Sequence, residues 1–436
     1  MTTPHRQRRP DPSLPSTADL ELSVAPLGEG WGVSLRLSEP DNRAGPFPIQ
    51  LDLAMLRALE LDAADYGAAL RDALFAEPEA CTAFRECRAA VLRPGQRLRV
   101  RLLLPPALHA LRWERLLDPS SGRALGLDGD LLLSRYLSAN DYAPVLLRPR
   151  GRLRALIAVA APRDYEDHGL ARIDADAETR RAQAALAELE TTAIAGTWDA
   201  LRESLDQDYD ILYLVAHGAI QREQPWLWLV DDQGNADRRR GGALADWLRG
   251  LGERRPRLVV LASCESAGDG HADTLAALGP QLAQAGVPAV LAMQGKLSIA
   301  TNERFAAAFF RELLVDGLID RAANKARLAV ADRPDWWVPV LYTRLKDGRL
   351  WREEAEPAPT ENPYQLRAPV ADFVGREAEI AELTTALSQA DTSVALIRRL
   401  SRDGRHRQDR AGDGGGQPAC RAFPRRSDRP ESPGLA

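Results

Sequence analysis

Residues 211–218 read ILYLVAHG, and residues 258–266 read LVVLASCES. Both begin with a short apolar run of strand length, and each run is followed by a reactive side chain, His217 in the first and Cys264 in the second. The carboxyl ends of parallel strands meet at one edge of a sheet, which is where ligands bind in such folds. The sequence therefore predicts that His217 and Cys264, 47 positions apart, come together at that edge.

Strands and helices alternate along the chain on both sides of these two runs. From residue 151 onward we expect strands at 153–160, 191–195, 210–216, 257–262, 288–293 and 337–342, helices at 175–189, 198–205, 244–251, 274–285, 303–315 and 319–330, and a hairpin around 226–234. Such alternation predicts an α/β fold in which a mostly parallel sheet is sandwiched by helices. An α+β segment at 18–150 precedes it, with strands at 20–24, 31–37, 98–104 and 131–136, helices at 53–75 and 78–92, and a helical turn within 111–118.

The composition restricts the class of protein. The 436 residues suffice for two or three domains of about 150 residues each, and a net charge of -5 gives no sign of a nucleic-acid partner. The four cysteines fit neither a disulfide framework nor a zinc site, so we expect no metal, no cofactor and a reducing compartment. No apolar run approaches the ~18 residues of a membrane span, and residues 1–15 lack the apolar stretch of a signal peptide. A soluble cytoplasmic protein is therefore predicted.

A histidine beside a cysteine is sufficient to generate a thiolate nucleophile. An imidazolium stabilises the thiolate and lowers the pKa of a cysteine, which is ordinarily near 8.5, and His217 can then protonate the leaving amine. The backbone N–H groups of Gly218 and Cys264 can form an oxyanion hole. Two alternatives stay open: both side chains serve only packing, or His271, in a loop seven residues beyond Cys264, is the partner.

Four segments of the chain resemble the CHAT domain, a caspase-like fold: YLVAHG at 213–218, LASCES at 261–266, AGVPAVLAMQ at 285–294 and WVPVLY at 337–342. The resemblance covers about residues 18–346. It implies a cysteine peptidase in which His217 and Cys264 are the catalytic residues. It also implies that the backbone N–H groups of Gly218 and Cys264 hold the oxyanion.

Substrate-pocket residues do not carry over directly from this resemblance. Asp164, after the first strand of the alternating part, and Glu265 are candidates for contacting the substrate residue before the cut, and ordinary surface charges are the alternative. The chain departs from many CHAT proteins in one respect, because no period near 34 residues, the mark of TPR repeats, precedes the domain.

A second resemblance lies near the carboxyl end. DFVGRE at 372–377 resembles the start of a STAND-type P-loop ATPase. The expected G-x-x-x-x-G-K-[ST] does not follow, because GGGQP at 414–418 supplies neither a lysine nor a hydroxyl for phosphate and magnesium. With suitable codons, a one-base shift over residues 402–411 restores a P-loop. We therefore hypothesise a frameshift, which genomic DNA with very different codons there would refute.

The predicted organisation has six parts: a disordered N-terminus at 1–17, the α+β part of the CHAT region at 18–150, the caspase-like catalytic domain at 151–346, a linker at 347–368, the start of an ATPase domain at 369–397, and a disordered tail at 398–436. The function expected is a cysteine endopeptidase, the effector part of a bacterial signalling or defence protein that has lost its ATPase module. Its partners would be a protein or peptide substrate and that missing regulatory module.

Two other functions and one processing site stay open at this stage. The same fold could serve as a non-catalytic signalling scaffold, or the same His–Cys pair could act on esters or transfer acyl groups. The segment 232–242, with its three arginines at 238–240, is a candidate exposed loop for self-cleavage.

Overall fold

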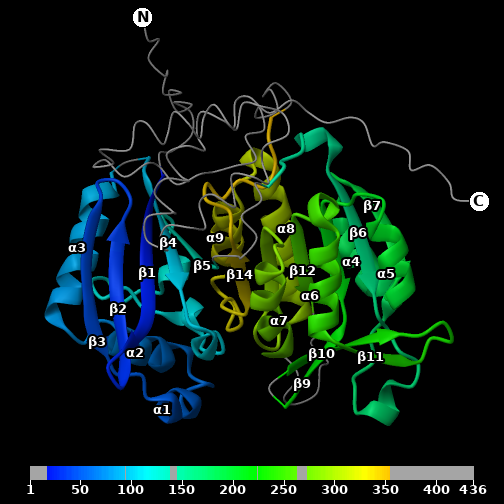
Figure 1. The fold of residues 1–436 in the computed structure, drawn as a ribbon, viewed down its shortest axis with the longest axis horizontal. Helices are drawn as coiled ribbons and strands as arrows, with labels where there is room; N and C mark the ends of the chain where they lie inside the picture. Colours follow the sequence, from blue (N-terminus) through cyan, green and yellow to red (C-terminus); the bar gives the residue numbers. More distant parts are fainter. Residues whose placement is uncertain (1–16, 94, 138–144, 223, 263–272, 354–436) are drawn as a thin grey trace, which may run out of the picture. The chain divides into compact units, whose positions relative to one another are not determined.

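One sheet of eleven strands runs through the part of the chain that the structure describes, residues 17–93, 95–137, 145–222, 224–262 and 273–353 (Figure 1). In this computed structural model the strand order is β3-β2-β1-β4-β5-β14-β13-β12-β8-β6-β7. The strands are β1 (Thr17–Leu27), β2 (Gly30–Leu37), β3 (Asn42–Ile49), β4 (Arg97–Leu103), β5 (Leu131–Tyr136), β6 (Arg154–Val159), β7 (Glu190–Ala195), β8 (Ile211–Val215), β12 (Leu258–Ala262), β13 (Ala289–Met293) and β14 (Pro339–Thr343). Most neighbouring strands are parallel, which confirms the predicted sheet.

Helices cover both faces of this sheet, as the alternation of elements predicts. They are α1 (Leu53–Ala58), α2 (Ala63–Leu74), α3 (Pro78–Val91), α4 (Ala175–Ala185), α5 (Trp198–Leu205), α6 (Gly241–Gly250), α7 (Asp273–Gln284), α8 (Ile299–Asp316) and α9 (Ile319–Ala329). Alternate residues of β12 separate the two sides. Leu258 and Val260 join the core with α4, α8 and α9, while Val259 and Leu261 join the core with α5, α6 and α7. Because both faces are covered, every residue of β12 is buried and the strand is apolar throughout.

The last strand that the structure describes, β14, lies in the middle of the sheet. Tyr342 and Thr343 pair in parallel with Arg135 and Tyr136 of β5, and the other edge of β14 pairs antiparallel with β13. The strands of the N-terminal segment and those of the alternating part are therefore hydrogen-bonded into one sheet.

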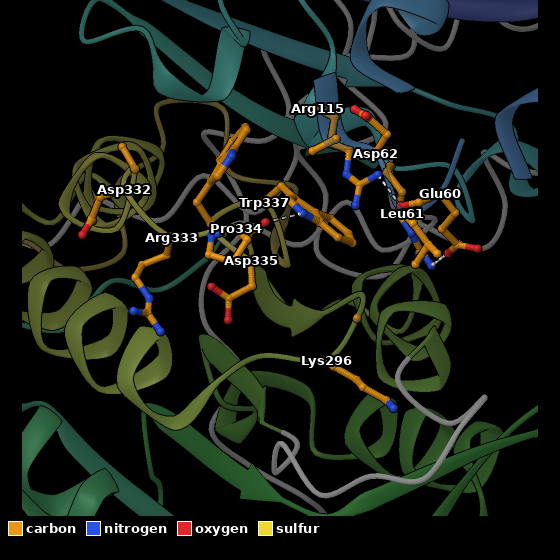
Figure 2. Close-up of a pocket in the computed structure, with 15 residues that line it drawn as sticks. Glu60, Leu61, Asp62, Arg115, Lys296, Asp332, Arg333, Pro334, Asp335 and Trp337 are labelled. Atoms are coloured by element: carbon orange, nitrogen blue, oxygen red, sulfur yellow. Dashed lines mark hydrogen bonds and ion pairs between the residues drawn. The ribbon is translucent and has the colours of Figure 1, made fainter. Parts of the chain in front are cut away.

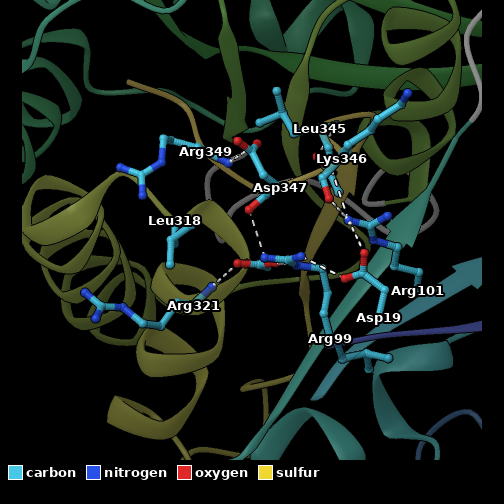
Figure 3. A network of polar contacts seen from close by, with 12 residues as sticks. Asp19, Arg99, Arg101, Leu318, Arg321, Leu345, Lys346, Asp347 and Arg349 are labelled. Carbon is cyan, nitrogen blue, oxygen red and sulfur yellow. Dashed lines mark hydrogen bonds and ion pairs between the residues drawn. The ribbon is translucent and has the colours of Figure 1, made fainter. Parts of the chain in front are cut away.

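A buried polar network ties this N-terminal segment to α9 (Figure 3). Arg99 of β4 is 5% exposed, and its guanidinium contacts Asp320 of α9, the Asp19 carboxylate of β1 at 2.8 Å and the Asp347 carbonyl at 2.9 Å. Arg101 adds a contact to the Lys346 carbonyl. Burial alone would lower the pKa of Arg99, but Asp320 and Asp19 outweigh it and raise that pKa, so the guanidinium stays charged. One cation thus links β1, α9 and the segment after β14.

The structure corrects two expectations in the N-terminal segment. The helix predicted at 53–75 is divided into α1 and α2, because the Asp62 carboxylate accepts hydrogen bonds from the Ala64 and Asp65 N–H groups and starts a new helix. The strand β3 was not predicted, because Pro46 and Pro48 argue against a strand interior. Such residues are tolerated at a sheet edge, and β3 is one of the two edge strands.

A second, antiparallel sheet of three strands follows β8: β9 (His217–Gln221), β10 (Gln224–Val230) and β11 (Ala236–Arg240), in the order β11-β10-β9. The predicted hairpin is confirmed by β10 and β11, whereas β9 was not predicted. The expectation of an exposed loop at 232–242 holds only for the turn at 232–235. It is wrong for the three arginines at 238–240, which belong to β11 and pair with β10. Paired strands resist proteases, which prefer exposed loop tips.

Candidate active site

The carboxyl ends of β8 and β12 lie side by side. Val215 is in register with Ala262, and the ladder continues one residue further, where the Ala216 N–H donates to the Ala262 carbonyl at 3.3 Å. His217 therefore stands at the edge of the sheet, one position beyond the last described hydrogen bond between this chain segment and the end of β12. Cys264 is two positions beyond Ala262 and, with Glu265 and His271, lies outside the described residues.

His217 is held in one orientation at this edge. The residue is 1% exposed, and its Nε2 lies 2.8 Å from the carbonyl oxygen of Ala171, in the segment before α4. A carbonyl can only accept, so Nε2 carries a proton and donates it to Ala171. In the neutral imidazole, Nδ1 is then the nitrogen with the lone pair, and it is the atom that takes up a proton in acid–base chemistry.

Gly218 is the member of the predicted oxyanion hole that lies in the described ranges, and it follows His217 in β9. It is buried and lies opposite Leu227 of β10. His217 itself lies opposite Trp228. The ladder of the small sheet thus fixes the backbone from the candidate catalytic histidine onward, and the bond from the Ala216 N–H to the Ala262 carbonyl fixes the backbone before it.

Asp164, the predicted pocket residue, is bound to the same small sheet. Its Oδ1 accepts from the Ala236 N–H at 2.7 Å, and its Oδ2 lies 3.1 Å from Nε2 of His168. Partial desolvation would raise the pKa of the carboxyl, but the Ala236 N–H and His168 outweigh it and hold that pKa below its usual value. The His168 ring in turn lies 4.9 Å from the ring of Trp228, the residue opposite His217. Asp164 thus supports the hairpin beside His217.

A buried ionic cluster lies at the end of β13, and sequence reasoning missed it. Arg135 is fully buried and pairs with Glu114, Nη2 to Oε2, at 2.6 Å. The Gln294 amide donates to the same oxygen at 2.6 Å and to the Trp337 carbonyl at 2.9 Å. The available signal was the pair of charges inside the apolar runs LLLSRY and LRWERLL, because charged residues are buried only when they are paired.

The stability of the chain is expected to fall as the pH is lowered from about 6.5 to 4, because of His109. Burial, and then the Arg135 charge, lower the pKa of His109 to about 4 from an ordinary value of 6.5. In this window the unfolded histidine binds a proton and the folded one does not. The contribution is therefore complete above pH 6.5 and is lost as the pH falls. The shift corresponds to about 3 kcal/mol.

Urea unfolding at a series of pH values checks this expectation. His109→Gln should flatten the decline between pH 6.5 and 4. Equal slopes for the wild type and His109→Gln would contradict the assignment.

No cluster in the described ranges suits a metal, since no group of three or more His, Cys, Asp or Glu side chains there is placed to hold one. The helices of the same part of the chain are also too short or too polar to cross a membrane.

Comparisons with known proteins place the chain in a family. The CHAT domain profile matches residues 64–365, and no curated protein matches the chain. Similar solved structures are the Arg-specific cysteine proteinase gingipain R (11% identity, TM-score 0.38, 68% of this chain and 76% of that chain), the Drosophila initiator caspase Dronc (11%, 0.28, 46% and 82%) and Saccharomyces cerevisiae separase in its securin complex (12%, 0.34, 62% and 17%). Because the profile match spans well over half of its length, the chain belongs to the CHAT domain family.

Proposed function

We propose that the protein is a cysteine endopeptidase in which Cys264 is the nucleophile and His217 the general base and acid. The observation that carries the proposal is the register of β8 and β12, since Val215 pairs with Ala262 and the two residues in question follow those strand ends by two positions each. The fixed orientation of His217 on the Ala171 carbonyl adds support, because an oriented base is the usual companion of a nucleophilic thiol.

The reaction would proceed through an acyl-enzyme. Nδ1 of His217 takes the thiol proton, and the thiolate of Cys264 attacks the scissile carbonyl, whose oxygen becomes an oxyanion held by the N–H groups of Gly218 and Cys264. Collapse breaks the C–N bond, and His217 gives its proton to the leaving amine. Water then attacks the thioester with His217 as base, which releases the new carboxylate and restores the thiol.

The remaining parts of the proposal concern regulation. We infer that the peptidase is a cytoplasmic effector in a bacterial signalling or defence protein and that it was once coupled to a STAND ATPase. The motif at 372–377 supports this inference and lies outside the described residues, as do most of the predicted linker and the tail at 398–436. Glu265 and Asp164 stay candidates for contacts to the substrate.

Peptide cleavage by the full chain is expected to require Cys264. Wild-type protein and Cys264→Ala would each be incubated with a diverse peptide library, and the products read by mass spectrometry. Cuts that appear only with the wild type would support the proposal and give the specificity. Cys81→Ala, which removes a half-buried free thiol of α3, is the matched control and should cleave like the wild type.

Two alternatives have distinct outcomes in the same preparation. No cleavage, together with no labelling of Cys264 by iodoacetamide, would instead favour a non-catalytic scaffold. Turnover of small esters without peptide cleavage would favour an esterase or acyl transferase that uses the same pair of residues.

A further inference from the structure

The small sheet that follows β8 has one face in the core and one face turned away from it (Figure 1). Leu227 and Leu229 of β10 are buried in the core with α5, α6 and α7. The alternate residues Trp226 and Trp228 therefore point to the opposite side, and each is only half-buried. Two tryptophans on the outward face of a sheet are unusual, and exposed aromatic surface of this kind indicates a site of interaction.

Two arginines of β11 lie against these tryptophans. Arg240 is opposite Trp226 in the ladder, and Arg238 is opposite Trp228. The guanidinium carbon of Arg238 is 4.5 Å from the centre of the Trp226 ring and 5.3 Å from that of Trp228. The guanidinium carbon of Arg240 is 5.3 Å from the Trp226 ring. We call these four residues the Trp–Arg face. Tryptophan and arginine are among the residue types that contribute most to binding at protein interfaces.

The positive charge of the Trp–Arg face is not neutralised by the part of the chain that the structure describes. Arg238 donates from Nη2 to Oε1 of Gln221 at 2.8 Å, and Arg240 is exposed. Neither arginine forms an ion pair within the described ranges. Arg239, by contrast, lies opposite Leu227 on the inner side and pairs with Asp237 at 2.7 Å. The outward face thus has guanidinium charge available to an external anion.

A different arginine–tryptophan contact in the chain is closed to ligands. The Arg115 guanidinium lies 3.7 Å from the centre of the Trp337 ring (Figure 2), and Arg115 is only 3% exposed. Protein covers that guanidinium, so its contact contributes to packing. Arg240 is exposed at the end of its strand, so an anion in solution can reach it.

The Trp–Arg face is on the same side of the small sheet as the candidate catalytic histidine. Directly opposite residues of a ladder point to the same side, and His217, Trp228 and Arg238 form one such row. Arg240 is two strands and two residues away from His217, which is about 12 Å between Cα atoms at ordinary strand spacing and rise. An extended chain advances about 3.4 Å per residue, so a substrate side chain about two to five residues from the cut would reach Arg240.

We propose that the Trp–Arg face binds an acidic segment of the polypeptide substrate, with a glutamate or aspartate side chain on the guanidinium of Arg240. The inference rests on the proposed peptidase function and deepens it, because it names the kind of substrate. A guanidinium that stacks on an aromatic ring keeps its in-plane N–H groups for a carboxylate.

Nucleic acid fits the Trp–Arg face less well than an acidic peptide does. Bases bind such surfaces by stacking on aromatic rings. Here the Trp226 ring already contacts two guanidinium groups, and the Trp228 ring contacts Arg238 and the His168 ring at 4.9 Å. The free groups of the face are therefore the N–H donors of arginine rather than the ring faces.

Binding to the catalytically silent full chain tests this inference. The Cys264→Ala protein would be titrated with two pools of fluorescein-labelled twelve-residue peptides, and binding read by anisotropy. One pool carries three glutamates among uncharged residues, and the other carries glutamines at those positions. We expect the glutamate pool to bind about three- to tenfold more tightly, since exposed ion pairs contribute little singly and two arginines act together. Added salt should reduce the difference, because the site is exposed.

Substitutions in the same background locate the preference. Arg240→Gln, at an exposed position that does not threaten folding, should remove most of it, and Arg238→Gln/Arg240→Gln should abolish it. Arg239→Gln is the matched control, because it removes the same charge from the inner side of the same strand. The control should leave the preference intact, which separates direct contact from net charge.

Cleavage by the wild-type chain gives a second readout. Among the library peptides that are cut, glutamate and aspartate should be enriched about two to five residues from the cut. This enrichment should disappear in Arg240→Gln.

Three results would overturn the proposal. They are equal binding of the two peptide pools, a preference that persists in Arg238→Gln/Arg240→Gln, and Arg240-dependent binding of an oligothymidylate that is tighter than binding of the glutamate pool. Cleavage without acidic enrichment, together with equal binding, would refute the Trp–Arg face and leave the peptidase standing. An Arg240-dependent preference in a protein that never cleaves would support the Trp–Arg face and refute the peptidase.

Discussion

Replacing His217 by alanine is expected to lower kcat/KM for a cleaved peptide by about 10²- to 10⁴-fold. The alanine protein retains the thiol but lacks the imidazole that takes its proton and passes it to the leaving amine. The chain should still fold, since His217 is the first residue of β9 and the cores beneath the sheet do not contain it. Single-turnover kinetics with a peptide identified from the library would measure the loss.

Three further variants separate His217 from its competitors. Because the two residues act as a unit, adding His217→Ala to Cys264→Ala should cause no further loss. His168→Ala, which removes a half-exposed ring packed on Trp228, should retain most activity. A His217→Ala enzyme that keeps full activity, together with an inactive His271→Ala, would assign the proton transfer to His271 instead.

The largest loss of stability is expected from Arg135→Met, about 3–5 kcal/mol in the free energy of unfolding. Arg135 is fully buried and holds both carboxylate oxygens of Glu114, which is itself 1% exposed. Burial alone would raise the pKa of Glu114, but the charge and hydrogen bonds of Arg135 outweigh it and lower that pKa. Methionine would fill the space and leave a buried carboxylate without its cation.

Urea unfolding of paired variants checks this explanation. The double variant Arg135→Met/Glu114→Gln should recover a large part of the loss. Removing one partner leaves a buried charge uncompensated, whereas replacing both partners leaves no unpaired charge. Arg254→Met, which breaks the exposed pair with Asp206, should leave the midpoint nearly unchanged. A loss in the double variant as large as in Arg135→Met would mean that packing, not the unpaired charge, is responsible.

The sequence predicted the helices and strands in which apolar residues recur with the period of that helix or strand. The boundaries expected for α5 match the structure, and β8 and β12 lie within one residue of their predicted runs. The position of His217 followed from β8 alone, because a strand end in a parallel sheet is also a sheet edge.

The missed features depend on contacts between distant residues. The strand β9 has only two clearly apolar side chains and exists because it pairs with β10. The contact of the Arg115 guanidinium with the Trp337 ring joins a one-turn helix of the N-terminal segment to a residue more than 200 positions later. No local pattern in the sequence predicts that Arg115 is buried. Its neighbours Glu114 and Leu116 form a mixture of charged and apolar residues that is equally typical of an exposed amphipathic turn.

The central place of β14 has a consequence for the time at which the protein can form. Ribosomes synthesise the chain from its N-terminus. The strand that pairs with both β5 and β13 is complete only when residues 339–343 have been added. Until then a nascent chain carries two half-sheets with unpaired inner edges, a state open to aggregation. The hydrogen bond from the Gln294 amide to the Trp337 carbonyl, just before β14, also forms only after this part of the chain has been synthesised. The packing of Arg115 against the Trp337 ring is likewise absent from a nascent chain until most of the CHAT region has been made.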